Sequence, residues 1–382
     1  MLVLSLPMSP VIQTLADLVR INSVNSSYEG GPGEREIATY VRRFFEQQSI
    51  EVWEQEVFPG RPNVLARLPG MNPGRRIVLE AHTDTVSVQG MTIPPFEPTI
   101  RDGKMWGRGS CDTKAGLAAM MHAVASLKEQ GLTPPCEVLL AAVVDEEFSY
   151  RGVVSLCEGL KADAAIVAEP TELRAVIATK GVLRCRIVVQ GKAAHSSKPH
   201  LGVNAISQMA KVIAALEADQ EWLSARQHPL VGSGTCNIGV IRGGVQVNFV
   251  PDRCAIEIDR RLLPGERAED AVMHYRQLLA SLPGIQAHIE EPLLLVDEGL
   301  DTSADAAVVQ VATAVLGELG LNAAPSGVPF GCDASKLSRA GVPSIVFGPG
   351  SIDRAHTVDE YVELDQVEQA LEFQKRFLLA FT

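Results

Sequence analysis

The sequence has no long apolar run and few positive charges, and both shortages exclude classes of protein. Its longest apolar run, Val138 to Val144, is far below the 18 or more residues that a membrane-spanning helix requires. Lys and Arg number 34 against 46 Asp and Glu, so the formal net charge is −12. An acidic chain argues against a protein that binds nucleic-acid phosphates or anionic membranes. We therefore expect no membrane and no nucleic acid among its partners.

Paired cysteines and a secretory leader are also missing. The seven cysteines contain no C-x-x-C pair, and their odd number favours reduced thiols over a disulfide framework. The stretch Met1 to Pro10 lacks a positively charged start and contains two prolines, so we expect no signal peptide. The expected location is cytoplasmic.

Three common catalytic motifs do not occur. Gly107-Arg108-Gly109 lacks the third glycine of a dinucleotide-binding fingerprint. The chain has no G-x-x-x-x-G-K-[ST] phosphate loop and no G-x-S-x-G turn around a nucleophilic serine. A nucleotide-binding enzyme and a serine hydrolase therefore have no support.

What is present is the pattern of an α/β protein. With 382 residues, 46% of them hydrophobic and 21% charged, the chain is long enough for two to three globular domains. Apolar strands alternate with helices, which predicts a mostly parallel sheet with helices on both faces. The two runs 63–68 and 76–81 flank a turn-rich Pro69 to Gly74, which predicts a hairpin. A helix is expected to begin at Ser9-Pro10 and to include Val11, Leu15, Leu18 and Val19, and further helices are expected at about 34–48, 114–130, 303–319 and 365–380. Further strands are expected at 138–144, 164–168 and 344–347.

The pattern changes near residue 181. Strand, helix, strand, strand, helix and strand follow in order up to about residue 292, which predicts an inserted ferredoxin-like α+β domain. The expected domains are therefore the first part of a large domain at 1–180, the insert at 181–293, and the second part of the large domain at 294–382.

Acidic and histidine side chains follow the ends of the predicted strands. Ligand sites of open α/β sheets lie at the carboxyl ends of the strands, and no Lys or Arg stands at these ends to neutralise the acids. Converging carboxylates would repel one another unless a cation lies among them. The sequence therefore predicts a metal site, with candidate ligands His82, Asp112, Glu147, Glu169 and His356.

A charge count predicts two ions. Three carboxylates contribute −3, which two divalent ions and a shared hydroxide would neutralise, whereas one ion would leave too many ligands. Histidine and carboxylate ligands suit Zn²⁺, with Co²⁺ or Mn²⁺ as alternatives. Asp84 is placed to orient His82 through the second imidazole nitrogen. Glu146 remains free to act as general base on a water.

The motifs around these residues resemble the di-zinc metallopeptidases that include aminoacylase, acetylornithine deacetylase, succinyl-diaminopimelate desuccinylase and glutamate carboxypeptidase. The resemblance covers nearly the whole chain. It implies His82 and Glu169 on one ion, Glu147 and His356 on the other, Asp112 as the bridge and Glu146 as the base. It also implies a cis peptide bond between Asp112 and Thr113. The motifs that carry it are His82-Thr83-Asp84, Gly107 to Lys114, Asp145-Glu146-Glu147, Ala168-Glu169-Pro170, Gly191 to Ser197 and Gly348 to Thr357.

The same resemblance implies that the large domain is the catalytic, metal-binding domain and that the insert is a lid or dimerisation domain. It also implies roles for three residues of the insert. His195 matches a histidine that one subunit of a homodimer sends to the oxyanion formed at the other subunit's metals. Asn248 matches a substrate-contacting asparagine. Arg261 matches an arginine that pairs with the substrate α-carboxylate.

The expected function is a two-metal amidohydrolase acting on an N-acyl amino acid. A dipeptidase or glutamate carboxypeptidase-like enzyme acting on a short peptide is the alternative within the class. A metal-free binding or scaffold relative is the alternative outside it, although a scaffold would need neither the five ligands nor Glu146.

Overall fold

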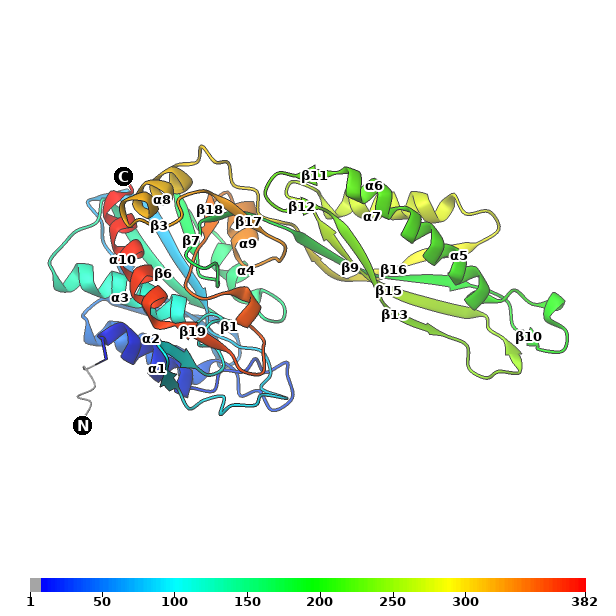
Figure 1. Cartoon of the computed structure of the whole chain (residues 1–382), viewed down its shortest axis with the longest axis horizontal. Helices are drawn as coiled ribbons and strands as arrows, with labels where there is room; N and C mark the ends of the chain where they lie inside the picture. The colour runs from blue at the N-terminus through cyan, green and yellow to red at the C-terminus, as the bar shows by residue number, and fades with distance from the viewer. Residues whose placement is uncertain (1–7) are drawn as a thin grey trace. The chain divides into compact units, whose positions relative to one another are not determined.

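The computed structural model of the chain describes residues 8–382, and Figure 1 shows its course. Residues 1–7, which hold most of the stretch for which no signal peptide is expected, lie outside the described part. Within residues 8–382, no helix is long and apolar enough to cross a membrane. The chain divides into two compact units. The small unit comprises Ala178–Asp301 and Gly327–Gly331, and the large unit comprises the residues before it, Thr302–Ser326 and Cys332–Thr382.

The large unit is built on an eight-stranded sheet. Its centre is parallel, because β6, β3, β7 and β18 all run in one direction, while the pairs β1/β2, β2/β6 and β18/β8 are antiparallel. The strand order is β1 (Glu51–Phe58), β2 (Arg61–Leu68), β6 (Cys136–Val143), β3 (Asn72–His82), β7 (Ala164–Val167), β18 (Ser344–Val346), β8 (Val176–Thr179) and β17 (Ser326–Val328).

Helices cover this sheet on both faces. Ile77 and Leu79 of β3 join the main hydrophobic cluster with apolar residues of α1, α2, α3, α8 and α10. Val78 is equally buried but lies outside that cluster, because successive side chains of a strand point to opposite faces. The remaining helices, α4 and α9, contact strands β6 and β18 respectively. The helices are α1 (Pro10–Arg20), α2 (Arg35–Gln47), α3 (Lys114–Glu129), α4 (Arg151–Cys157), α8 (Ala307–Glu318), α9 (Ala334–Arg339) and α10 (Leu364–Ala380).

The predicted hairpin between residues 63–68 and 76–81 is wrong. Strands β2 and β3 do not pair, because β6 lies between them. The hairpin partner of β2 is β1, a strand that the sequence reading missed. The turn after β2 packs on the start of β6, where a Cβ added to Gly70 would lie 2.2 Å from the carbonyl carbon of Cys136. This turn therefore leads the chain past β6 to the centre of the sheet.

A three-stranded sheet joins two distant segments of the large unit. It consists of β4 (Thr99–Arg101), β5 (Lys104–Trp106) and β19 (Tyr361–Glu363), in the order β19-β5-β4. Trp106 of β5 lies opposite Tyr361 of β19. The residues after β5 and before β19 are thereby held close together. A short 3₁₀ helix, η2 (Ile352–Arg354), precedes β19.

The small unit has the βαββαβ order that the sequence predicts. Its four antiparallel strands lie in the order β13-β15-β9-β16, and apolar residues of α5 and α7 pack against the sheet in a second core. The elements are β9 (Gly181–Gln190), β10 (Ala194–His195), η1 (Pro199–Leu201), α5 (Ala205–Ala218), α6 (Gln220–Ala225), β11 (Gln227–His228), β12 (Gly232–Ser233), β13 (Thr235–Gly243), β14 (Phe249–Val250), β15 (Arg253–Leu262), α7 (Ala268–Ala280) and β16 (Gln286–Asp297).

The fold class is therefore the expected one, a large α/β unit and a small α+β unit. One detail differs, because β16 continues beyond Pro292 to Asp297. The register of β16 against β9 shifts between Glu290 and Leu295, and a proline is tolerated at such an irregularity. The division into domains at 181 and 293 stays a prediction.

Candidate active site

The parallel strands deliver acidic and histidine side chains to one edge of the large sheet. His82 is the last residue of β3. Its two neighbours, β6 and β7, run parallel to it and end at Val143 and Val167, so that Glu146 and Glu147 follow one strand and Glu169 the other. Parallel strands bring their carboxyl ends to the same edge. The common direction of these strands therefore explains why His82 and Glu169, more than 80 positions apart, lie at the same edge.

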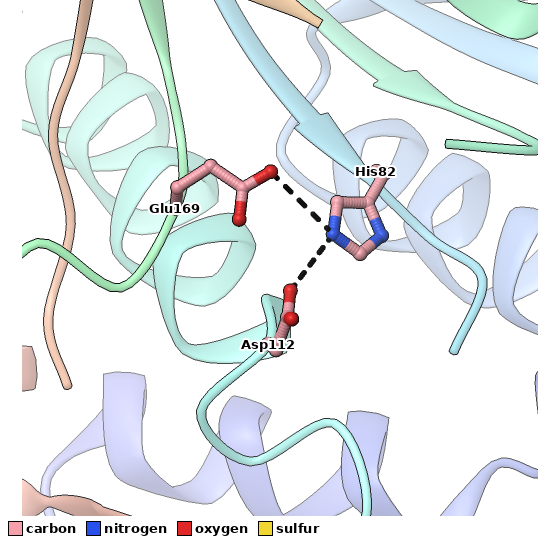
Figure 2. Close-up of side chains that lie close together, drawn as sticks. All are labelled: His82, Asp112 and Glu169. Atoms are coloured by element: carbon pink, nitrogen blue, oxygen red, sulfur yellow. Dashed lines mark hydrogen bonds and ion pairs between the residues drawn. The ribbon is translucent and has the colours of Figure 1, made fainter. Parts of the chain in front are cut away.

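His82, Asp112 and Glu169 form the first ligand group. Figure 2 shows the three side chains pointing toward one another. The Nε2 atom of His82 lies 3.0 Å from Oδ1 of Asp112 and 3.9 Å from Oε1 of Glu169. All three residues are buried, with at most 6% of any of them exposed.

Asp112, Glu147 and His356 form the second group. The Nε2 atom of His356 lies 3.2 Å from Oδ2 of Asp112 and 3.1 Å from Oε1 of Glu147. Asp112 thus offers one carboxylate oxygen to each group. The side chain of His356 is 51% exposed while that of Glu147 is 6% exposed, so the second group is the more open to solvent.

Burial and mutual repulsion shift the pKa values of these carboxylates and histidines. Burial and the nearby Asp112 raise the pKa of Glu169 well above its usual range. Burial opposes ionisation of Asp112, but hydrogen bonds from His356 and His82 hold its pKa below the usual value. Burial lowers the pKa of His356, but its hydrogen bonds to Asp112 and Glu147 outweigh this and raise it to about 11. Within residues 8–382, the ion pairs of these three carboxylates are all with the two histidines.

Both groups fit divalent metal ions. In each group the three ligand atoms lie within 4.8 Å of one another, and imidazole nitrogen with carboxylate oxygen is a donor set that Zn²⁺ and related ions accept. Cations would also remove the repulsion among the buried carboxylates. The arrangement can therefore hold two ions that share Asp112. The peptide bond between Asp112 and Thr113 is cis, as the resemblance implies.

Asp84 makes more contacts than the sequence suggested. Its carboxylate accepts hydrogen bonds from the backbone N–H groups of Glu146 and Glu147, both at 3.1 Å. The Nδ1 atom of His82 lies 3.0 Å from the backbone oxygen of Asp84 and 3.6 Å from its carboxylate. The backbone carbonyl is thus the closer partner of the imidazole, and the carboxylate fixes the turn that carries Glu146.

Glu146 has the environment of a proton-accepting group. It follows Asp145, a non-glycine residue with a φ of +70°, and is partly buried. Burial and the neighbouring Glu169 raise the pKa of Glu146 well above its usual range. A carboxylate whose pKa is raised toward neutrality can accept and later release a proton.

Two residues near the site carried no sequence signal. Asn25 donates hydrogen bonds from Nδ2 to Asp84 at 2.8 Å and to Asp145 at 3.0 Å. Tyr28 donates its hydroxyl hydrogen to the backbone oxygen of Glu147 at 3.0 Å. Both lie in a loop after α1 with no motif spacing, so only the tertiary structure could identify them.

The candidate residues of the small unit occupy two places. His195 of β10 lies opposite Phe249 of β14, and the backbone oxygen of Asn248 accepts a hydrogen bond from Ser196 at 3.1 Å. His195 and Asn248 are thus near one another, and both are exposed. Arg261 lies on β15, where its Nε donates to Oδ1 of Asp259 at 2.8 Å.

The chain is similar to known peptidases and deacylases. A model of the peptidase family M20/M25/M40 matches residues 78–380. The acetylornithine deacetylase of Myxococcus xanthus is 34% identical over 318 residues, which cover 80% of this chain and 80% of that protein. The N-formyl-4-amino-5-aminomethyl-2-methylpyrimidine deformylase of Bacillus subtilis (strain 168) is 26% identical over 367 residues, covering 87% and 85%. The crystal structure of aminopeptidase PepT from Bacillus cereus superimposes with a TM-score of 0.78 at 25% identity, covering 97% of this chain and 98% of that one.

Proposed function

Because this chain belongs to the peptidase family M20/M25/M40, whose members compared above are amide hydrolases, we propose that it is a two-metal amidohydrolase that cleaves the amide of an N-acyl amino acid. The observation that carries the proposal is the pair of ligand groups that share Asp112, with Glu146 on the turn that also carries Glu147. A binding scaffold would need neither the shared carboxylate nor a spare acid beside it.

The chain's own residues divide the work of hydrolysis. His82 and Glu169 would hold one ion, Glu147 and His356 would hold the other, and Asp112 would contribute to both positions. Bound divalent ions supply Lewis acidity and lower the pKa of water. Glu146 takes a proton from the attacking water and passes it to the leaving amine nitrogen as the amide C–N bond breaks. The products are a carboxylate and a free amine. Zn²⁺ is the proposed metal, with Co²⁺ or Mn²⁺ as alternatives.

Residues of the small unit are proposed to act on the substrate. His195 donates a hydrogen bond to the developing oxyanion, which in water-poor sites is worth several kcal/mol. Asn248 contacts the substrate, and Arg261 pairs with its α-carboxylate through a two-point guanidinium contact. Within residues 8–382, Arg261 makes its ion pair through Nε, which leaves the two terminal nitrogens for a carboxylate.

The small unit also supports the proposal of a homodimer. Strand β13 is an edge strand, and an uncovered edge tends to pair or to be covered. Apolar side chains gather near its end, where Val245 is 90% and Val247 100% exposed. A two-fold contact would cover this surface on both copies.

We place the enzyme in the cytoplasm, on the sequence alone.

The names of the relatives favour two different substrate classes. The name of the Myxococcus relative favours an N-acyl amino acid, and that of the Bacillus deformylase also describes removal of an acyl group. The aminopeptidase PepT favours the alternative, a dipeptidase or carboxypeptidase.

The test combines metal analysis with a substrate panel. Purified protein should contain two divalent ions per chain, and it should release amine from N-acetyl, N-succinyl or N-formyl amino acids faster than from dipeptides. The same substrates with an α-carboxamide should react poorly, because they lack the carboxylate for Arg261. A protein that binds no divalent ion in titration, or that hydrolyses none of the panel, would contradict the proposal. Faster cleavage of dipeptides would favour the alternative.

Arg261→Lys tests the substrate-binding part separately. Lysine keeps the charge but cannot make a two-point contact, so KM should rise while the metal content stays at two. Arg184→Lys is the matched control, because Arg184 contacts the same Asp259 from a neighbouring strand at 2.7 Å. Equal rises in KM would indicate that the effect comes from weakened ion pairs with Asp259 on the sheet, and not from a lost contact with the substrate.

A further inference from the structure

Glu360 is a buried carboxylate whose two oxygens are both used. It is 0% exposed. Its Oε2 accepts a hydrogen bond from Nη1 of Arg108 at 2.6 Å. Its Oε1 accepts from the backbone N–H groups of Cys111 at 2.9 Å and Asp112 at 3.1 Å. Its backbone oxygen accepts from the N–H of Gly107 at 3.0 Å. One residue thus holds the loop 107–112 at both ends.

Other hydrogen bonds hold the rest of the loop, since Arg108 donates its backbone N–H to Pro95 at 2.8 Å and Cys111 donates its thiol to Ser351 at 3.4 Å. Within residues 8–382, the N–H of Asp112 has Glu360 as its acceptor. The loop also contains Gly107 with a φ of +151° and Gly109 with a φ of +79°, conformations in which glycine is much less restricted than other residues. Its last residue, Asp112, must present one oxygen to each ligand group, Oδ1 to His82 and Oδ2 to His356. An aspartate side chain has only two rotatable bonds, so the position of its backbone decides whether both oxygens reach their groups.

Glu360 also lies four residues after His356, a member of the second ligand group. The pairing of β19 with β5 brings this segment alongside the start of the loop. A single stretch of chain therefore supplies His356 to one group and holds the residue that the two groups share.

We infer that Glu360 is the positioning residue of the shared carboxylate: by holding the backbone N–H of Asp112, it lets one side chain serve both metal positions and couples the occupancy of one position to that of the other. This inference rests on the proposed two-metal function. Glu360 contacts the backbone of Asp112 and not its carboxylate, so it acts on the two groups through Asp112.

A purely structural role is the competing explanation. Arg108 and Glu360 form an ion pair with side chains 3% and 1% exposed, and removing one partner of a buried pair leaves an unpaired charge that destabilises the fold. Glu360→Gln alone could therefore fail for reasons unrelated to the metals. Replacing both partners avoids this, because the charges are removed together.

The experiment compares three proteins with wild type in the full chain. They are Glu360→Gln, the double variant Arg108→Met with Glu360→Leu, which removes both oxygens that accept from the loop, and Glu363→Gln as the matched control. Glu363 lies on β19, three residues after Glu360, its side chain is 31% exposed, and its ion pair with Lys104 spans 3.9 Å. Thermal unfolding of each metal-free protein measures the fold. Titration of the metal-free protein with Zn²⁺, in competition with a chelator, measures the affinity of each binding step.

We expect the double variant to remain folded, with a lower unfolding temperature, but to bind the two Zn²⁺ ions about 10- to 100-fold more weakly, as loss of a residue that orients a metal ligand typically does. The two binding steps should also become less dependent on each other. Glu363→Gln should bind as wild type does. If the double variant binds both ions within threefold of wild type, the inference is overturned while the two-metal function stands. If wild type itself binds no divalent ion, the function fails first.

A second readout does not depend on the metals. Hydrogen exchange of the metal-free proteins, followed by mass spectrometry over peptides that contain residues 107–112, reports whether the N–H of Asp112 is held. Exchange in this segment should be at least tenfold faster in the double variant and unchanged in Glu363→Gln. Unchanged exchange in the double variant would mean that Glu360 does not hold this loop, and would also overturn the inference.

Discussion

The candidate residues of the large unit and those of the small unit are held in different ways. His82 and Asp112 are 2% and 6% exposed and make several contacts each. His195 lies on a two-residue strand, is exposed, and has its side chain in contact with Ser197. A buried residue with several partners has a defined position before any ligand arrives, whereas an exposed side chain on a short strand retains rotamer freedom. The candidate residues of the large unit, which we call the preassembled set, therefore have positions that the unit's own contacts define. His195 and Asn248 of the small unit, which we call the exposed set, are not buried in this way.

The largest expected effect is on turnover, and it tests Glu146 of the preassembled set. Glu146→Gln keeps the shape of the side chain but cannot take a proton from water, so turnover should fall by about 10²- to 10⁴-fold or more. The two bound ions should remain, as measured by elemental analysis per chain. Glu147→Gln is the comparison, because it alters a proposed ligand and should lose metal as well as activity. Turnover within a few-fold of wild type in Glu146→Gln would show that another group is the base.

The next largest effect tests His195 of the exposed set. His195→Ala should cost about 3 to 4 kcal/mol of transition-state stabilisation, measured as kcat/KM. If His195 acts on the metals of a second copy, mixing His195→Ala with Glu146→Gln should restore activity, because each mixed dimer contains one site with both groups. Mixtures that stay inactive after subunit exchange has been demonstrated would rule out action between copies. A fully active monomer in light scattering would do the same.

A smaller effect concerns the contacts that hold the large-unit site. Asp84→Asn removes a charged acceptor for the N–H groups of Glu146 and Glu147, so Zn²⁺ affinity should fall by about 10- to 100-fold. Chelator competition measures it. Asp353→Asn, in the 3₁₀ helix near His356, is an exposed control that should bind as wild type does. Equal Zn²⁺ affinity in Asp84→Asn and wild type would show that these hydrogen bonds do not position the ligands.

The smallest effect uses a buried histidine of the large unit that lies away from the metals. Burial lowers the pKa of His122 to about 4, below the value of about 6.5 expected in the unfolded chain. The unfolded state therefore binds the proton first, and stability is lost as pH falls from about 6.5 to about 4. His122→Gln should reduce the loss of unfolding free energy between pH 7 and pH 5 by about 1 kcal/mol, allowing for partial exposure.

Urea unfolding at the two pH values measures this difference. Gln can still hydrogen-bond to Thr14, which lies 2.8 Å from Nε2 of His122. His200→Gln, at an exposed position of the small unit, is the control and should leave the pH dependence unchanged. A larger loss in His122→Gln than in wild type would contradict the assigned direction.

Much of the fold could be read from local patterns. The helix predicted at 114–130 corresponds to α3 (Lys114–Glu129), and the strand predicted at 138–144 corresponds to β6 (Cys136–Val143). Each end agrees within two residues, because the apolar pattern of both segments is long and regular. The expected resemblance to metallopeptidases is confirmed by the family match. The pairing of β2 and β3 was predicted wrongly, since adjacency in sequence does not reveal a strand that arrives later and inserts between them.

The sequence by itself determined which chemistry the large unit can hold. Acidic and histidine residues at the ends of apolar strands must meet, because parallel strands place their carboxyl ends at one edge. Only the tertiary structure decided how these residues are supported. Asn25, Tyr28 and Glu360 reach the site from loops, and the hydrogen bond between Glu360 and Arg108 spans 252 positions in the chain. Such contacts depend on how separate elements pack, which no local spacing records.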